Sequence, residues 1–209
     1  MKTLESINTN PNTAVCQLGM LPGIYEQLSL TGDVLEFGTF TGKSTVLLAS
    51  EMPSKKIYTI DHFLGLEQTK KAPIGDWYEG AFAIGRPEYV NEETVPQTVE
   101  ELKAKLAAFF NIQLIESDVH KLEHPDTYGI GEVGLVNVDV DIYEPTVSAL
   151  EFLTKCKWNR IFIRFDDWHG DEPNFYEHER LAFAEWIVKY QYDYEITHGG
   201  FIGGVIVTR

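Results

Sequence analysis

The sequence is poor in cysteine and has no long hydrophobic run. Its two cysteines, Cys16 and Cys156, lie far apart and have no C-x-x-C spacing, so we expect two reduced, buried thiols and no disulfide framework. No apolar segment is long enough to span a bilayer, and the first residues lack the apolar core of a signal peptide. We therefore expect a cytoplasmic protein without a membrane partner.

Positive charge is also scarce in this chain. Lys and Arg number 17 against 32 Asp and Glu, which gives a formal net charge of −15 at pH 7. Such a surface repels the phosphates of nucleic acids and of anionic lipids, and no local cluster of Lys and Arg offsets the repulsion. The composition therefore argues against a nucleic-acid partner, and it leaves open a homo-oligomer.

Strand-like and helix-like segments alternate along the chain, which predicts an α/β fold with a mostly parallel sheet. We expect strands over 33–37, 56–60, 112–115, 133–138, 160–165, 194–197 and 203–208, and helices over 44–50, 98–110, 144–155 and 176–190. The last two strands are too close in sequence for a parallel crossover. The prediction is a Rossmann-like, seven-stranded sheet with an antiparallel C-terminal strand and helices on both faces.

The 209 residues suit a single domain, with an N-terminal helical segment over 1–30 and an insertion over 69–98. The insertion holds Trp77, Tyr78, Phe82 and Tyr89 among Gly and Pro, and it is too long for an ordinary connection. It could be a static insertion with its own aromatic core. Because it leaves the carboxyl end of the second strand, we favour a lid over a substrate.

Each of the first five strands ends in or beside an acidic residue, at the edge where open α/β sheets bind ligands. These residues are Glu36, Asp61, Asp118, Asp139 and the pair Asp166 and Asp167. A single Asp in such a place is more often a helix cap than a ligand. Five strand ends in series indicate a shared site.

The turn after the first strand reads E-F-G-T-F-T-G-K-S, from Glu36 to Ser44. Its glycines permit a tight turn and a close approach of the backbone to a ligand, but the turn matches neither the G-x-G-x-x-G fingerprint nor a P-loop. Asp61 is expected to accept hydrogen bonds from ribose hydroxyls, and Asp118 to lie beside an adenine. The expected cofactor-binding residues are Glu36, Gly38, Thr39, Gly42, Ser44, Asp61, His62, Asp118 and Val119.

Four blocks of the sequence resemble the macrocin O-methyltransferase family of class I S-adenosylmethionine-dependent enzymes. They are V-L-E-F-G-T-F-T-G-K-S (Val34 to Ser44), I-D-H-F-L-G-L (Ile60 to Leu66), V-D-V-D-I-Y-E-P-T (Val138 to Thr146) and F-D-D-W (Phe165 to Trp168). The third block is the most specific of the four. The resemblance implies the class I methyltransferase fold, S-adenosylmethionine as cofactor, and magnesium-dependent methylation of a hydroxyl of a small molecule such as a natural-product sugar.

The same resemblance implies that Asp139, Asp166 and Asp167 hold the metal and makes Asp139 a candidate general base. Three carboxylates independently suit Mg²⁺ or Mn²⁺, whereas no Cys and His set suits zinc. A metal beside a hydroxyl lowers its pKa and orients it for attack on the sulfonium methyl. His169 directly follows the Asp pair and is a second candidate catalytic base.

The chain departs from the family pattern at several positions, and substrate identity does not transfer. Arg164 stands inside the fifth strand, Trp168 replaces a Tyr, and Pro145 replaces a Ser. Three other readings remain: a metal-independent methyltransferase acting on nitrogen or carboxylate, a non-catalytic S-adenosylmethionine-binding protein, and an NAD-dependent oxidoreductase. The last is the weakest because the dinucleotide fingerprint is missing.

Overall fold

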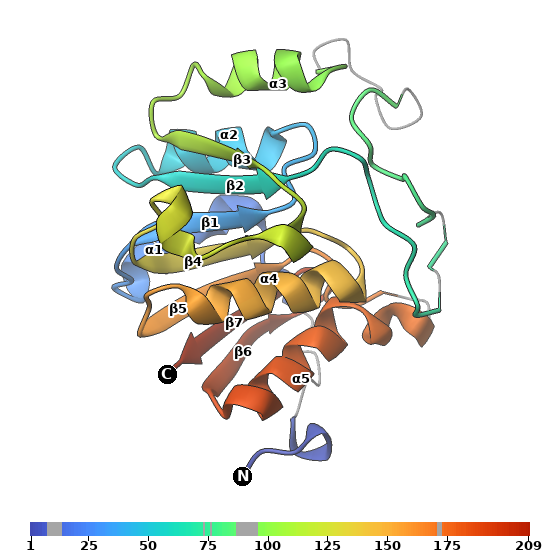
Figure 1. Cartoon of the computed structure of the whole chain (residues 1–209). Coiled ribbons are helices and arrows are strands. Elements are labelled where there is room, and N and C mark those ends of the chain that lie inside the picture. The colour runs from blue at the N-terminus through green and yellow to red at the C-terminus, as the bar shows by residue number, and fades with distance from the viewer. Residues whose placement is uncertain (8–13, 73, 76, 87–95, 171–172) are drawn as a thin grey trace.

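The computed structural model describes residues 1–7, 14–72, 74–75, 77–86, 96–170 and 173–209. In this part of the chain seven strands form one sheet, in the order β3-β2-β1-β4-β5-β7-β6. The strands are β1 (Asp33–Phe37), β2 (Ile57–Asp61), β3 (Ile112–Glu116), β4 (Val133–Val138), β5 (Arg160–Phe165), β6 (Asp193–Gly199) and β7 (Gly203–Thr208). The order reverses between β1 and β4, and the carboxyl ends of the parallel strands there share one edge of the sheet (Figure 1).

Strand β7 is antiparallel to both of its neighbours, β5 and β6, whereas β3, β2, β1, β4 and β5 run parallel. Only three residues separate β6 from β7, at 200–202, and a link of this length can join antiparallel neighbours but not cross a sheet. The predicted seven-stranded sheet with an antiparallel C-terminal strand is therefore confirmed.

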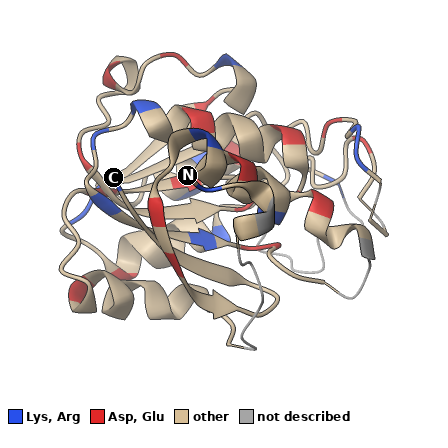
Figure 2. Cartoon of the chain, turned by 90° about the horizontal axis from the view of Figure 1, so that it is seen from below, with Lys and Arg blue, Asp and Glu red and all other residues tan. Residues whose placement is uncertain are grey.

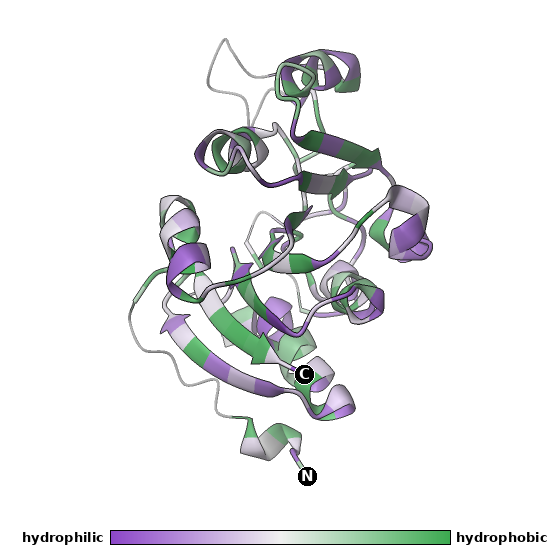
Figure 3. Cartoon of the chain, turned by 90° about the vertical axis from the view of Figure 1, so that its left-hand side faces the viewer, coloured by the Kyte–Doolittle hydropathy of each residue, from purple (hydrophilic) through white to green (hydrophobic). Residues whose placement is uncertain are grey.

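Five α-helices flank this sheet within the described residues (Figures 1 and 3). They are α1 (Leu21–Gln27), α2 (Lys43–Glu51), α3 (Val99–Leu106), α4 (Tyr143–Lys155) and α5 (Glu179–Tyr190). Short 3₁₀ helices are η1 (Leu4–Ser6), η2 (Leu18–Met20), η4 (Val119–Lys121), η5 (Pro125–Tyr128) and η6 (Pro173–Glu177). The helix expected from residue 176 begins three residues later, because 173–177 form the separate turn η6.

Hydrophobic side chains pack on both faces of the sheet. In Figure 3, green marks the hydrophobic residues along several of the strands. On one face Leu150 of α4 and Phe183 of α5 belong to the larger core, and on the other Tyr25 of α1 and Leu48 of α2 pack against the sheet. All six residues of β4 are buried, as expected for a central parallel strand. Helices on both faces are thus confirmed.

Charged residues lie mainly outside this core. In the view of Figure 2, Lys and Arg are spread over several elements rather than gathered on one. Both cysteines are free and buried, as predicted. None of the described helices combines the length and the apolar character that a membrane crossing requires.

Candidate active site

The glycine turn after β1 touches the end of β4. Gly38 has a φ of 92°, and a Cβ on it would lie 1.8 Å from the backbone oxygen of Asp139. Only glycine tolerates both this conformation and this approach. Gly42, with a φ of 71°, precedes α2 and donates its N–H to Thr39 O at 2.7 Å. The glycine turn and Asp139, the first of the predicted metal ligands, are therefore direct neighbours.

Asp61, at the end of β2, is tied to the same turn. One carboxylate oxygen accepts the backbone N–H groups of Thr39 and Phe40, each at 2.8 Å, and the other accepts that of Phe63 at 2.7 Å. A carboxylate has about four acceptor positions. Asp61 thus shapes the turn and retains limited capacity for a ribose, so its cofactor contact stays a prediction.

A cleft of about 820 Å³ opens beside the ends of β2 and β3. It is lined by His62, Leu64, Gly65, Leu66, Glu67, Glu79, Gly80, Glu116, Ser117, Asp118 and Lys121. Asp118 caps η4 by accepting the N–H of His120 at 2.9 Å, and it pairs with Lys121 at 2.9 Å. Partial burial opposes ionisation of Asp118, but Lys121 and the His120 N–H outweigh it and lower the pKa of the carboxyl. Two predicted cofactor residues, His62 and Asp118, therefore share this cleft, and Val119 follows in η4.

Glu36 is fully buried, and its carboxyl bonds to the protein itself. It accepts the hydroxyls of Thr45 at 2.5 Å and Thr59 at 2.8 Å and the side-chain amide of Asn137 at 3.1 Å. Burial raises the pKa of Glu36, while these hydrogen bonds and one from Ser44 oppose the rise. Glu36 and Ser44 hold the base of the turn, and a direct contact of either with a cofactor stays a prediction.

The three predicted metal ligands converge. Asp139, Asp166 and Asp167 each place a carboxylate oxygen within 4.8 Å of the others, and each is half-buried. They come from the ends of β4 and β5, which pair in parallel and so deliver their last residues to one point. Burial, then the charges of Asp166 and Asp167, raise the pKa of Asp139 well above its ordinary range. Hard oxygen donors at this separation fit a divalent cation such as Mg²⁺ or Mn²⁺.

Two further acids adjoin this cluster, and the sequence analysis did not assign either to the metal site. Asp141, at a φ of 60°, shares a side-chain hydrogen bond with Asp167. Glu179, the first residue of α5, is fully buried and accepts the Asp167 N–H at 3.0 Å, while its other oxygen has no partner among the described residues. Burial, then the charge of Asp167, raise the pKa of Glu179 well above its ordinary range. A glutamate in the first turn of a helix is so common that its spacing carried no signal.

Arg164 connects the metal candidates to the centre of the sheet. This side chain is only 5% exposed, and its guanidinium donates to Asn137 Oδ1 at 2.6 Å and forms an ion pair with Asp166. A charged residue in an otherwise apolar strand was the sequence signal, read as a departure from the family pattern. The structure makes it the direct partner of a metal-ligand candidate.

His169 lies among aromatic side chains. Its ring stacks on Tyr176 with 5.4 Å between centroids and lies 6.5 Å from the ring of Phe201. Its Nδ1 atom is buried and has no hydrogen-bond partner among the described residues. A catalytic role for His169 remains a prediction.

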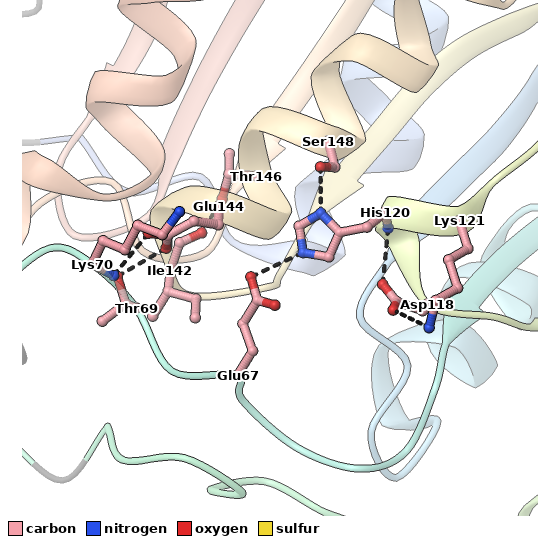
Figure 4. Close-up of polar contacts among 10 residues, drawn as sticks. All are labelled: Glu67, Thr69, Lys70, Asp118, His120, Lys121, Ile142, Glu144, Thr146 and Ser148. Atoms are coloured by element: carbon pink, nitrogen blue, oxygen red, sulfur yellow. Dashed lines mark hydrogen bonds and ion pairs between the residues drawn. The ribbon is translucent and has the colours of Figure 1, made fainter.

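The segment that follows β2 runs along the edge where the parallel strands end (Figure 1). Figure 4 shows two of its attachments: His120 bridges Glu67 at 2.9 Å and Ser148 at 2.6 Å, and Glu144 accepts Thr69 Oγ1 at 2.9 Å. Glu144 also accepts the N–H of Lys70 at 2.8 Å. The first residues of the predicted insertion over 69–98 are therefore hydrogen-bonded to α4.

Deeper in the insertion, ring contacts attach it to other elements. Trp77 lies 5.4 Å from Phe175 and 5.7 Å from His178, measured between ring centroids, and Phe82 lies 6.0 Å from Phe40 of the glycine turn. Tyr78 is 46% exposed, so the aromatic residues do not form one enclosed core. Tyr89 lies outside the described residues.

Comparison with known proteins identifies the fold. No protein-family model matches the chain, and no curated protein matches its sequence. The O-methyltransferase NovP matches in structure with a TM-score of 0.64 and 18% identity, over 92% of this chain and 77% of NovP. The calicheamicin methyltransferase CalS11 matches with a TM-score of 0.62 and 22% identity, over 91% and 77%. A SAM-dependent methyltransferase from Aquifex aeolicus matches with a TM-score of 0.53 and 15% identity, over 99% and 98%.

The fold is therefore that of the class I S-adenosylmethionine-dependent methyltransferases. The chain is similar in structure to the O-methyltransferases NovP and CalS11, which confirms at the level of the fold the resemblance carried by the four sequence blocks.

Proposed function

We propose that the protein is an S-adenosylmethionine-dependent O-methyltransferase that uses a divalent cation, Mg²⁺ or Mn²⁺, and acts on a hydroxyl of a small molecule. The observation that carries the proposal is the convergence of Asp139, Asp166 and Asp167 within 4.8 Å, next to the Gly38 turn. Metal-assisted transfer of a methyl group requires that the turn that binds the cofactor lie next to the oxygen ligands that hold the metal.

The cofactor would be held by the turn after β1 and by the acids of β2 and β3. Backbone groups of Gly38 and Thr39 would approach it, Asp61 would meet its ribose, and Asp118 its adenine. The cleft of about 820 Å³ beside Asp118 supports this placement. The SAM-dependent methyltransferase from Aquifex aeolicus supports the choice of cofactor, and the O-methyltransferases NovP and CalS11 support oxygen as the methylated atom.

The chain's own residues supply the proton chemistry. Asp139 is the proposed proton acceptor, because its carboxylate belongs to the acidic cluster beside the Gly38 turn. A divalent cation at the cluster would lower the pKa of an adjacent hydroxyl. The methyl group passes from the sulfonium sulfur to the acceptor oxygen, the hydroxyl proton passes to Asp139, and the products are a methyl ether and S-adenosylhomocysteine.

The acceptor is proposed to be a hydroxylated small molecule, with a sugar as the leading class. CalS11 is described as a TDP-rhamnose 3'-O-methyltransferase, which supports a sugar hydroxyl here. We also propose that residues 1–209 form one domain and that residues 69–98 act as a lid, because the described part of this segment borders the site and is fastened to α4 through Glu144.

The experiment is methyl transfer from labelled S-adenosylmethionine to a panel of hydroxylated acceptors, with EDTA and with Mg²⁺ added back. We expect EDTA to abolish transfer and Mg²⁺ to restore it, while calorimetry shows S-adenosylhomocysteine still bound in EDTA. Full activity in EDTA, with no metal in the purified protein, would contradict the metal role and favour a metal-independent methyltransferase. Absence of cofactor binding under either condition would contradict the methyltransferase proposal itself.

A further inference from the structure

Arg164 is a buried cation in the middle of the sheet. It lies in β5 at the position paired with Asn137 of β4, which in turn pairs with Glu36 of β1. Its neighbours in β5 are the apolar residues Ile163 and Phe165, both fully buried. A buried charge is costly unless partners satisfy it, so a guanidinium in this place requires a specific set of acceptors.

Each of three guanidinium nitrogens has an acceptor. Nε donates to the backbone oxygen of Cys16 at 3.1 Å, Nη1 donates to Asn137 Oδ1 at 2.6 Å, and Nη2 donates to Asp166 Oδ1. Asn137 is itself held by its amide, which donates to Glu36 at 3.1 Å. The guanidinium is therefore fixed from three directions and cannot swing away from Asp166.

This fixed positive charge stands beside three carboxylates that repel one another. The charges of Asp166 and Asp167 raise the pKa of Asp139, and Arg164 opposes that rise, as it does for Asp167. Arg164 thus acts on all three metal-ligand candidates, through a direct ion pair with one and through its field on the other two.

We propose that Arg164 is a positioning residue that serves as the built-in counter-ion of the metal centre. It holds the three carboxylates together when no metal is bound, and it weakens the affinity of the site for a divalent cation. The inference rests on the proposed metal site. One guanidinium and one divalent cation together balance the charge of Asp139, Asp166 and Asp167.

Removing Arg164 has two opposite effects on the affinity for the divalent cation, and the larger effect decides whether this affinity rises or falls. Asp166 would lose one orienting partner, but it is a short side chain at the end of a strand, with few rotamers to lose. Without Arg164, the bound cation would no longer be repelled by a positive charge that is bonded to Asp166, one of the proposed ligands. The repulsion between the guanidinium and the cation is large because Arg164 is buried and the carboxylates are half-buried. The charge effect is the larger, so metal affinity should rise.

The test compares Arg164→Met with Arg164→Lys, using Mn²⁺ as the probe. We expect Arg164→Met to bind Mn²⁺ at least tenfold more tightly than the wild type, by calorimetry or by the electron paramagnetic resonance of free Mn²⁺. We expect Arg164→Lys, which keeps the positive charge, to bind Mn²⁺ within about threefold of the wild type, a smaller change than the loss of one charge-assisted contact produces. Lys189→Met, which removes an exposed partner of Glu151, is the control and should leave Mn²⁺ affinity unchanged.

A second readout is thermal stability in EDTA and in Mn²⁺. Arg164→Met should lose Tm in EDTA and recover most of the loss in Mn²⁺, and Asp139→Asn added to it should recover stability in EDTA. Unchanged or weaker Mn²⁺ affinity in Arg164→Met, or an equal loss of Tm in both buffers, would overturn the proposal. If Arg164→Met folds only in Mn²⁺, the proposal is supported. If it folds in neither buffer, Arg164→Gln is measured in the same way.

These measurements distinguish a failure of the counter-ion proposal from a failure of the proposed function. A wild type that binds no Mn²⁺ contradicts the metal centre, whatever Arg164 does. The counter-ion role is still tested by comparing the Tm in EDTA of Arg164→Met with that of the double variant Arg164→Met, Asp139→Asn. A double variant that is no more stable than Arg164→Met would overturn the counter-ion proposal.

Discussion

The carboxylate of Asp61 accepts the backbone N–H of Phe40 at 2.8 Å, which ties the end of β2 to the turn that follows β1. The same oxygen accepts the N–H of Thr39, so one side chain fixes two consecutive residues of the turn. The strand-end acid therefore has a structural task in addition to the cofactor contact proposed for it, and its replacement tests both.

Replacing Asp61 should weaken cofactor binding. Asp61→Ala removes a charged acceptor and loosens the turn, and we expect it to cost about 1.5–3 kcal/mol of S-adenosylhomocysteine binding, the scale of charged hydrogen bonds. Calorimetry measures the loss, and Asp126→Ala, at an exposed position in η5, is the matched control. Unchanged affinity in folded Asp61→Ala would show that the ribose is held elsewhere.

Gly38 should tolerate no side chain. A Cβ there would lie 1.8 Å from Asp139 O, and the φ of 92° disfavours other residues, so Gly38→Ala should destabilise the protein by more than about 3 kcal/mol. Gly131→Ala is the control, because nothing lies within 4 Å of its Cβ position. Chemical denaturation of both variants checks the prediction, and similar free energies of unfolding would contradict it.

Neutralising Asp166 should separate metal binding from cofactor binding. Asp166→Asn removes one anionic ligand of the proposed cation, so Mn²⁺ affinity should fall at least about tenfold, the scale of a lost charged contact. Affinity for S-adenosylhomocysteine should change less than about threefold, because the proposed cofactor contacts come from other strands. Equal losses of both affinities would argue against a distinct metal centre.

Glu144 should hold the segment after β2 in place. Its two hydrogen bonds to Thr69 and Lys70 are each worth about 1 kcal/mol, so Glu144→Ala should speed trypsin cleavage at Lys70 and Lys71 by about five- to thirtyfold. Glu151→Ala is the control, because Glu151 lies in the second half of the same helix and contacts Lys189 and Tyr190 of α5. If the segment is a lid, cofactor and acceptor together should slow cleavage of the wild type. Equal rates with and without both ligands would favour a static insertion.

His178 should make this attachment sensitive to acid. Burial lowers the pKa of His178 below its usual 6.5, and its Nε2 lies 3.1 Å from Ala72 O, so the neutral ring donates there. The hydrogen bond to Ala72 O and the charges of Glu144 and Glu177 oppose the lowering of this pKa, while Lys71 adds to it. A depressed pKa means that the stability contributed by the neutral ring is complete above pH 6.5 and is lost as the pH falls through the folded-state value.

The measurement is Tm against pH for the wild type and for His178→Gln, whose amide can donate to Ala72 O without titrating. We expect the wild type to lose Tm relative to His178→Gln as the pH falls from 7 towards 5. Parallel curves would show that His178 does not titrate in this window.

The strands that bring the acids together were predictable from sequence because their signals are local. Strands β1, β4 and β5 begin and end where the sequence predicted, since each is a mostly apolar run that ends before a Gly or an Asp. Parallel strands place the acids that follow them at one edge of the sheet, and the family resemblance then singled out Asp139, Asp166 and Asp167. The later start of α5 was missed because helix ends depend on the turn that precedes them.

The sequence by itself determined the strands of the sheet and its antiparallel last strand, because periodicity and short links act within a few residues, and its resemblance to a known family singled out Asp139, Asp166 and Asp167. Only the tertiary structure decided that Arg164, Asn137 and Glu36 form one buried row, since this depends on the register between β1, β4 and β5, which are far apart in the chain. The tertiary structure alone also decided that Glu179 lies beneath Asp167 and that Glu144 holds the segment after β2. Such contacts arise from long-range packing of helices on the sheet, which no local pattern records.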